Sequence, residues 1–117
     1  KTRKLEFLVA DALAQGADTL VTCGAPQSNH CRITLAAAVK EGLQCRFVIE
    51  ERVPHSYDAH ASGNNFMFRL MGVEAITVVP GGSVGGLHCP HELSPHATIA
   101  PSERSATVCQ PLSAKFV

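Results

Sequence analysis

Apolar and polar residues follow two different periods along the first part of the chain, and these periods predict alternating helices and strands. The opening stretch, KTRKLEFLVADALAQG, has apolar residues at helical spacing and a closing Gly16, which is typical of an amphipathic helix. The other predicted elements follow in chain order: a strand over 18–24, a helix over 28–41, a strand over 44–51, a helix over 61–71 and a strand over 74–82.

This alternation predicts an α/β fold. Nearly continuous apolar strands separated by helices are typical of a parallel sheet with flanking helices. Ligands of such sheets bind beyond the carboxyl ends of the strands. Here those ends lead into TCGAPQSN, EERVPHSY and PGGSVGG, so we look for chemistry in these three stretches.

The character of the sequence changes near residue 83. Residues 84–117 contain several prolines and show neither helical nor strand periodicity. A structureless stretch of this length is uncommon inside a compact domain. We therefore divide the chain into a folded part, residues 1–83, and an irregular tail, residues 84–117. The tail is either a genuine proline-rich extension or the product of a non-native reading frame.

Composition restricts the partners. The 117 residues suffice for one domain, and 45% hydrophobic with 17% charged residues is an ordinary globular composition. A formal net charge of zero argues against nucleic acid or an anionic membrane as a partner. No apolar run approaches the ~20 residues of a membrane span. The chain begins without Met inside a charged motif, and we expect it to be a fragment of a longer protein.

Five scattered cysteines, an odd number without CxxC spacing, favour reduced thiols in the cytoplasm over a disulfide framework. The tail stretch HCPH, with His88, Cys89 and His91, together with His96 and Cys109, suggests a metal site. Neither a paired CxxC nor a helical His pair supports one, so we predict no metal.

Cations crowd the start of the first predicted helix, at Lys1, Arg3 and Lys4. The helix dipole disfavours each of them there by about 0.3–1 kcal/mol. They form either a solvated cationic edge or a site for an anion that offsets this cost. A lysine at a helix N-terminus can have a lowered pKa, which favours a Schiff base with a carbonyl cofactor.

The turn CGAPQSNH joins a strand to a helix, and Ser28 and Asn29 are good N-cap residues. Such a turn is either an ordinary cap or an anion site. GGSVGG, residues 81–86, resembles a phosphate cradle but also fits the end of a strand. His30, Tyr57 and Asp58 fit packing or turn roles as well as a place beside the site.

These stretches together resemble a known family. KTRKLE, GADTLVT, QSNH, a helix preceded by GNN and a strand ending in VVPGG are similar to the 1-aminocyclopropane-1-carboxylate deaminase and D-cysteine desulfhydrase family, over about residues 1–83. The resemblance implies pyridoxal 5'-phosphate as cofactor. It also implies the two-domain fold of the tryptophan synthase β-subunit group, of which this chain holds a partial small domain.

The resemblance also implies roles for individual residues. Lys1 matches the lysine that forms the internal aldimine and moves protons at the substrate, and Lys4 matches a position near the cofactor phosphate. Ser28 matches the active-site serine. Asn29 matches the residue that hydrogen-bonds the phenolic oxygen of the cofactor, and Gln27 lines the same turn at the substrate.

The implied reaction breaks a small amino acid down to a 2-oxo acid and ammonia. QSNH followed by Cys31 resembles the desulfhydrases more than the deaminases, so we expect the D-cysteine desulfhydrase type, with 1-aminocyclopropane-1-carboxylate deaminase as the alternative. A further alternative is an inactive truncated α/β module. The resemblance implies a cytoplasmic homodimer as the parent enzyme.

Overall fold

The computed structural model describes residues 2–83, 98–100 and 105–108. Within them, three helices alternate with three strands and two short strands follow. The elements are α1 (Thr2–Ala14), β1 (Thr19–Gly24), α2 (Asn29–Lys40), β2 (Gln44–Glu51), α3 (Asn64–Met71), β3 (Ala75–Pro80), β4 (Thr98–Ala100) and β5 (Ser105–Val108).

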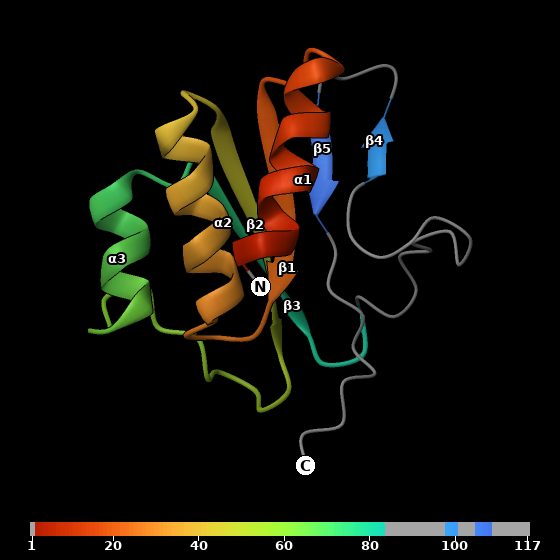
Figure 1. Ribbon diagram of the computed structural model, residues 1–117. Coiled ribbons are helices and arrows are strands. Elements are labelled where there is room, and N and C mark those ends of the chain that lie inside the picture. Colours follow the sequence, from red (N-terminus) through yellow and green to blue (C-terminus); the bar gives the residue numbers. More distant parts are fainter. Residues whose placement is uncertain (1, 84–97, 101–104, 109–117) are drawn as a thin grey trace.

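The strands form one sheet in the order β3-β2-β1-β5-β4. β2 pairs in parallel with both β1 and β3, β5 pairs in parallel with β1, and β4 pairs antiparallel with β5. The three helices lie along one face of this sheet (Figure 1). The predicted α/β fold, a parallel sheet with flanking helices, is confirmed.

The helix-covered face of the sheet holds the core. Along β2, every second residue (Cys45, Phe47 and Ile49) is at most 1% exposed, whereas Gln44 before them and Arg46 between them are exposed. This period of two places every second side chain against the helices. Phe47 meets Phe68 of α3 edge to face, with ring centroids 4.8 Å apart, so one aromatic pair fixes α3 to the sheet.

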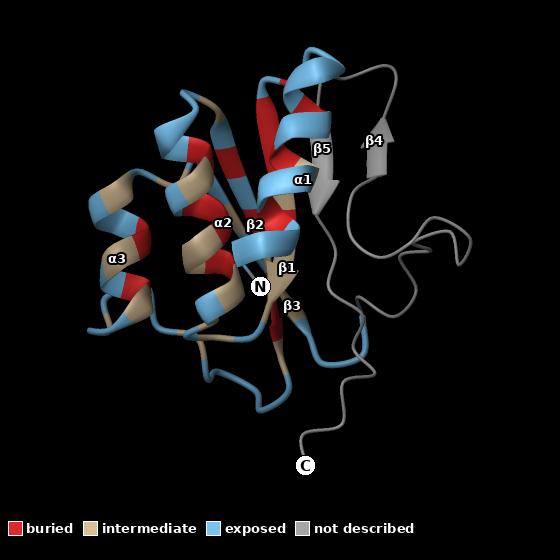
Figure 2. Ribbon diagram, in the orientation of Figure 1, coloured by how far each residue is buried: buried red, intermediate tan, exposed pale blue. Residues whose placement is uncertain are grey.

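The helices bury one stripe each. In α1, Leu5, Val9 and Ala12 recur every three or four residues and are buried. The buried positions of α1 and α2 lie on the sides turned toward the sheet (Figure 2). In the part of the chain that the structure describes, no helix is both long enough and apolar enough to cross a bilayer.

The element boundaries follow the predictions closely except at α3. The strand predicted over 44–51 is β2, and the strand predicted over 18–24 begins one residue later. The helix predicted over 61–71 begins only at Asn64, because Gly63 has φ of 72°, outside the helical range. It ends as predicted, with Gly72 in the left-handed conformation.

The predicted irregular tail, residues 84–117, is described only at two short segments. Two short strands, β4 and β5, lie within 84–117, and β5 extends the sheet beside β1. Strands of three and four residues are too short to show a period in the sequence. The rest of this segment lies outside the described residues, and its origin in a non-native reading frame stays a prediction.

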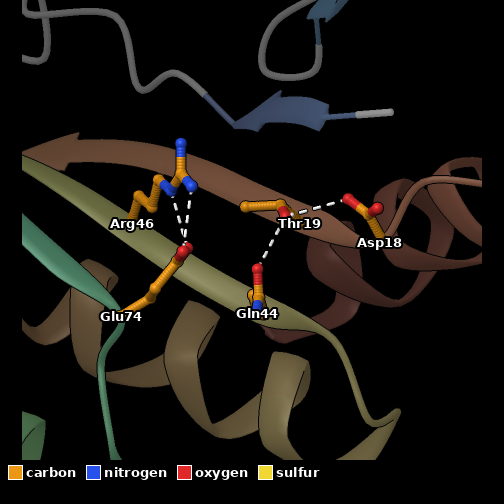
Figure 3. A network of polar contacts seen from close by, with 5 residues as sticks. All are labelled: Asp18, Thr19, Gln44, Arg46 and Glu74. Atoms are coloured by element: carbon orange, nitrogen blue, oxygen red, sulfur yellow. Dashed lines mark hydrogen bonds and ion pairs between the residues drawn. The ribbon is translucent and has the colours of Figure 1, made fainter. Parts of the chain in front are cut away.

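Polar contacts hold the edge of the sheet at which the parallel strands begin (Figure 3). The Thr19 hydroxyl lies 2.9 Å from Asp18 Oδ1 and 3.4 Å from Gln44 Oε1. Arg46 binds Glu74 through two hydrogen bonds of 2.6 and 2.9 Å, which lower the pKa of the Glu74 carboxyl. This edge is opposite to the one where ligands of parallel sheets bind, so we assign these contacts to structure.

Because two thiols are buried, we expect the free energy of unfolding to fall at alkaline pH. Burial raises the pKa of Cys31 to about 11 and that of Cys45 to about 12, from an ordinary value of 9.0. Above pH 9 the unfolded chain releases protons that the native chain keeps. The free energy of unfolding is therefore expected to fall by up to about 1.4 kcal/mol per pH unit for each thiol, until the native thiols ionise.

Urea unfolding at pH 8 and pH 10 measures this fall. The double variant Cys31→Ala, Cys45→Ala serves as the control, because it lacks both thiols and should show a flatter alkaline slope. An equal slope in the two proteins would contradict the assignment to these cysteines.

Candidate functional site

The candidate site lies at the edge of the sheet where β1, β2 and β3 end. The N-terminal ends of α1 and α2 lie at this edge (Figure 1). Because helix N-termini present unsatisfied N–H groups and partial positive charge, this edge suits an anion.

The turn between β1 and α2 depends on a glycine. A Cβ at Gly24 would lie 2.5 Å from Ser28 Oγ and 2.7 Å from Cys31 Sγ, closer than real atoms approach. Gly24 therefore lets the turn fold back against the end of β1. This close approach places Ser28 and the first turn of α2 directly over the carboxyl edge.

Ser28 is the N-cap of α2, as predicted. It has an extended backbone conformation, and its Oγ accepts the N–H of Cys31 at 3.2 Å. The side chain is partly buried. Because the hydroxyl oxygen accepts this bond, its proton stays available for a second group at the edge.

Gln27 links this turn to α3. It has φ of 60°, and its Oε1 accepts the N–H groups of Asn64 at 2.8 Å and Asn65 at 3.3 Å. Its Nε2 donates to the Ser62 carbonyl at 2.9 Å. Gly63, the N-cap of α3, has no side chain with which to cap the helix. Gln27 therefore caps α3 from a different loop, a role that the local sequence pattern did not indicate.

Asn29 lies at the first position of α2 and is exposed. Its Oδ1 accepts from Asn64 Nδ2 at 2.8 Å and from Arg32 Nη2 at 3.5 Å. Asn64 Nδ2 also donates to the Gln27 carbonyl at 2.7 Å. Three predicted site residues, Gln27, Ser28 and Asn29, thus form one turn, and Asn64 is the functional candidate that the sequence analysis missed.

Two of the three predicted cations, Arg3 and Lys4, lie among the described residues. Lys1, the predicted cofactor lysine, lies outside the described residues. Arg3 and Lys4 are exposed in the first turn of α1, which contains no acidic residue. The N-terminal end of α1 lies at the same edge of the sheet as that of α2 (Figure 1), so the first-turn cations add positive charge at this edge.

The other candidate residues make contacts within the fold. The His30 ring lies 2.9 Å from the hydroxyl of Thr22, a buried residue of β1. Burial raises the pKa of Tyr57, whose N–H donates to Glu51 Oε1. Asp58 Oδ1 accepts the N–H of His60, as a turn residue does.

Two N–H groups of the glycine-rich stretch after β3, those of Gly82 and Ser83, are already bonded within the fold. The N–H of Gly82 donates to Glu50 Oε1 at 2.5 Å, and a carboxylate at this position repels phosphate. Gly81 approaches the backbone of Glu51 so closely that a Cβ would lie 3.0 Å from its carbonyl oxygen. Residues 84–86 lie outside the described part of the chain.

No group of three or more His, Cys, Asp or Glu side chains capable of holding a metal occurs among residues 2–83, 98–100 and 105–108. The HCPH stretch, His96 and Cys109 lie outside these residues. None of the three cysteines within them forms a disulfide.

The fold and this edge define a class of protein: an α/β sheet whose carboxyl edge carries a strand-to-helix turn and two helix N-termini, groups that suit an anion. No family model matches the chain. D-cysteine desulfhydrase of Yersinia enterocolitica is 47% identical over 93 residues, which cover 79% of this chain and 26% of that protein. The 1-aminocyclopropane-1-carboxylate deaminases of a Methylobacterium species and of Rhizobium radiobacter are 48% and 49% identical, each over 73% of this chain and 26% of the relative.

A solved structure of an ACC deaminase homologue matches with a TM-score of 0.55 and 38% identity, over 66% of this chain and 22% of the other. The chain belongs to the 1-aminocyclopropane-1-carboxylate deaminase and D-cysteine desulfhydrase family. It spans about a quarter of the length of these curated relatives.

Proposed function

We propose that this chain is part of a pyridoxal 5'-phosphate-dependent enzyme that breaks a small amino acid down to a 2-oxo acid and ammonia. The observation that carries the proposal is the turn from Gly24 to Asn29, which presents a hydroxyl, an amide and a helix N-terminus at one edge. Its relatives are named as deaminases and a desulfhydrase, and both act on small amino acids.

The donors at this edge fit the cofactor. Helix N-termini and the Lys4 cation suit its phosphate, and the Asn29 amide suits an anionic ring oxygen. The turn depends on a glycine where a Cβ would displace Ser28. When bound, pyridoxal phosphate supplies an electron sink for negative charge on the substrate.

The proposed roles follow from side-chain chemistry. The Lys1 amine holds the cofactor and carries a proton at the substrate, and Lys4 neutralises the phosphate. The Ser28 hydroxyl lies beside the substrate as a proton carrier or nucleophile. Gln27 lines the same turn, and its side chain also holds this turn against α3.

The deaminase reaction is the better supported of the two. Residues His30 and Cys31 favoured the desulfhydrase in the sequence, yet most of the relatives compared are named 1-aminocyclopropane-1-carboxylate deaminase. His30 is bonded to Thr22, and Cys31 is a buried core residue. Both residues that favoured the desulfhydrase thus have contacts within the fold, and we place the deaminase first. The parent enzyme is proposed to be a cytoplasmic homodimer.

An assay with two substrates tests the proposed function. The whole enzyme that contains this segment is expected to release 2-oxobutyrate and ammonia from 1-aminocyclopropane-1-carboxylate. Release of sulfide and pyruvate from D-cysteine, without turnover of 1-aminocyclopropane-1-carboxylate, would support the desulfhydrase. Turnover of neither substrate would support an inactive α/β module. The 117-residue chain alone is expected to show little turnover.

A further inference from the structure

We infer that Asn64 is a positioning residue that sets which way the Asn29 carboxamide points. In this arrangement Asn29 presents its Nδ2, and not its Oδ1, to an anionic oxygen of the bound cofactor. The inference rests on the proposed function for the identity of that oxygen. The orientation of Asn29 itself rests only on hydrogen bonds within this chain.

The orientation of the Asn64 amide is fixed by the backbone carbonyl of Gln27. The Gln27 backbone carbonyl can only accept, so the Asn64 atom 2.7 Å from it must be the donor Nδ2. This nitrogen has two hydrogens, and the second one meets Asn29 Oδ1 at 2.8 Å. One Asn64 amide group therefore serves both residues of the turn.

The orientation of Asn64 in turn fixes that of the Asn29 amide. Its Oδ1 faces two groups that only donate, Asn64 Nδ2 and the Arg32 guanidinium. A flipped Asn29 amide would place its own NH2 group against both donors and would lose both bonds. Asn29 Nδ2 thus points away from Asn64, and it donates no hydrogen bond within the described residues.

Asn64 is itself held in place. Its backbone N–H donates to Gln27 Oε1 at 2.8 Å, and its side chain is partly buried at the first position of α3. The contacts join residues 35 to 38 positions apart in the sequence. This support places the Asn29 donor before the ligand arrives, which reduces the cost of ordering it on binding.

The substitution Asn64→Asp keeps the shape of the side chain and removes its donor. The introduced carboxylate can only accept, so the Asn29 amide is expected to turn its Nδ2 toward residue 64 and its Oδ1 toward the ligand. In the whole enzyme, loss of one hydrogen bond to a charged group should weaken pyridoxal phosphate binding roughly 10- to 100-fold.

A double-mutant cycle separates positioning from simple destabilisation. In an Asn29→Ala background, Asn64→Asp should weaken cofactor binding no further, because no amide is left to orient. The matched control is Asn65→Ala, in the same turn of α3 as Asn64. This substitution removes the hydrogen bond from the Asn65 side chain to the Asp58 carbonyl and leaves the bonds of Asn29 in place. It should lower the melting temperature and leave cofactor affinity unchanged.

NMR of the 117-residue chain without cofactor reads the orientation directly. In the unmodified chain, the Asn64 side-chain NH2 should exchange slowly and the Asn29 NH2 fast, and Asn64→Asp should slow the Asn29 NH2. Unchanged Asn29 exchange in that variant, or equal loss of cofactor affinity in both backgrounds, would overturn the inference. The expected exchange pattern in a protein that binds no cofactor would support the orientation of Asn29 and count against the proposed function.

Discussion

Replacing Phe47 with alanine is expected to lower the free energy of unfolding by about 3–5 kcal/mol. Phe47 is 1% exposed, and its ring meets the fully buried ring of Phe68 at an interplanar angle of 69°. The substitution removes this contact and leaves a cavity between β2 and α3. A domain is stable by only about 5–15 kcal/mol, so this loss is a large fraction of the total stability.

Urea unfolding followed by circular dichroism measures the effect of Phe47→Ala. Phe7→Ala is the matched control, because it removes the same side chain from a position of α1 that is 73% exposed. That variant should change the free energy of unfolding by no more than about 0.5 kcal/mol. Equal losses in the two variants would contradict the proposed position of the core.

The second large effect concerns Lys1. We expect Lys1→Ala in the whole enzyme to abolish the visible absorption band that pyridoxal phosphate develops on binding. Without this amine the cofactor has no covalent attachment and the substrate has no proton carrier. Turnover should fall by roughly a thousandfold or more, the scale seen when a catalytic nucleophile is removed.

Lys40→Ala is the control for this experiment. Lys40 ends α2 at the opposite end from the candidate site, and its ammonium is exposed beside Glu41. Its removal should leave both the absorption band and the turnover unchanged. Persistence of the band in Lys1→Ala would show that Lys1 does not hold the cofactor, and Lys4 would then be the next lysine to replace.

Local pattern was enough to predict the three helices and the first three strands. The strand over 44–51 is a short apolar stretch bounded by turn residues, so its predicted limits match β2. The C-terminal end of α3 was also predictable, because a left-handed residue at a helix end is usually glycine and Gly72 occupies that position.

Contacts between distant residues were not predictable in this way. The start of α3 was placed three residues too early because its cap comes from Gln27, 37 residues away from Asn64. The sequence indicated that Gln27, Ser28 and Asn29 form one turn. It did not indicate that the side chain of Gln27 is bonded to α3 or that Asn64 holds Asn29, because no local pattern encodes a bond between two loops.

Chemical trapping of the cofactor tests the central claim most directly. The whole enzyme is incubated with pyridoxal phosphate and reduced with borohydride, and the modified lysine is located by mass spectrometry of its peptides. The account predicts a reduced cofactor adduct on Nζ of Lys1, at the start of KTRKLE. An adduct on Lys4, Lys40 or Lys115 in place of Lys1, or no adduct on any lysine of this segment, would contradict it.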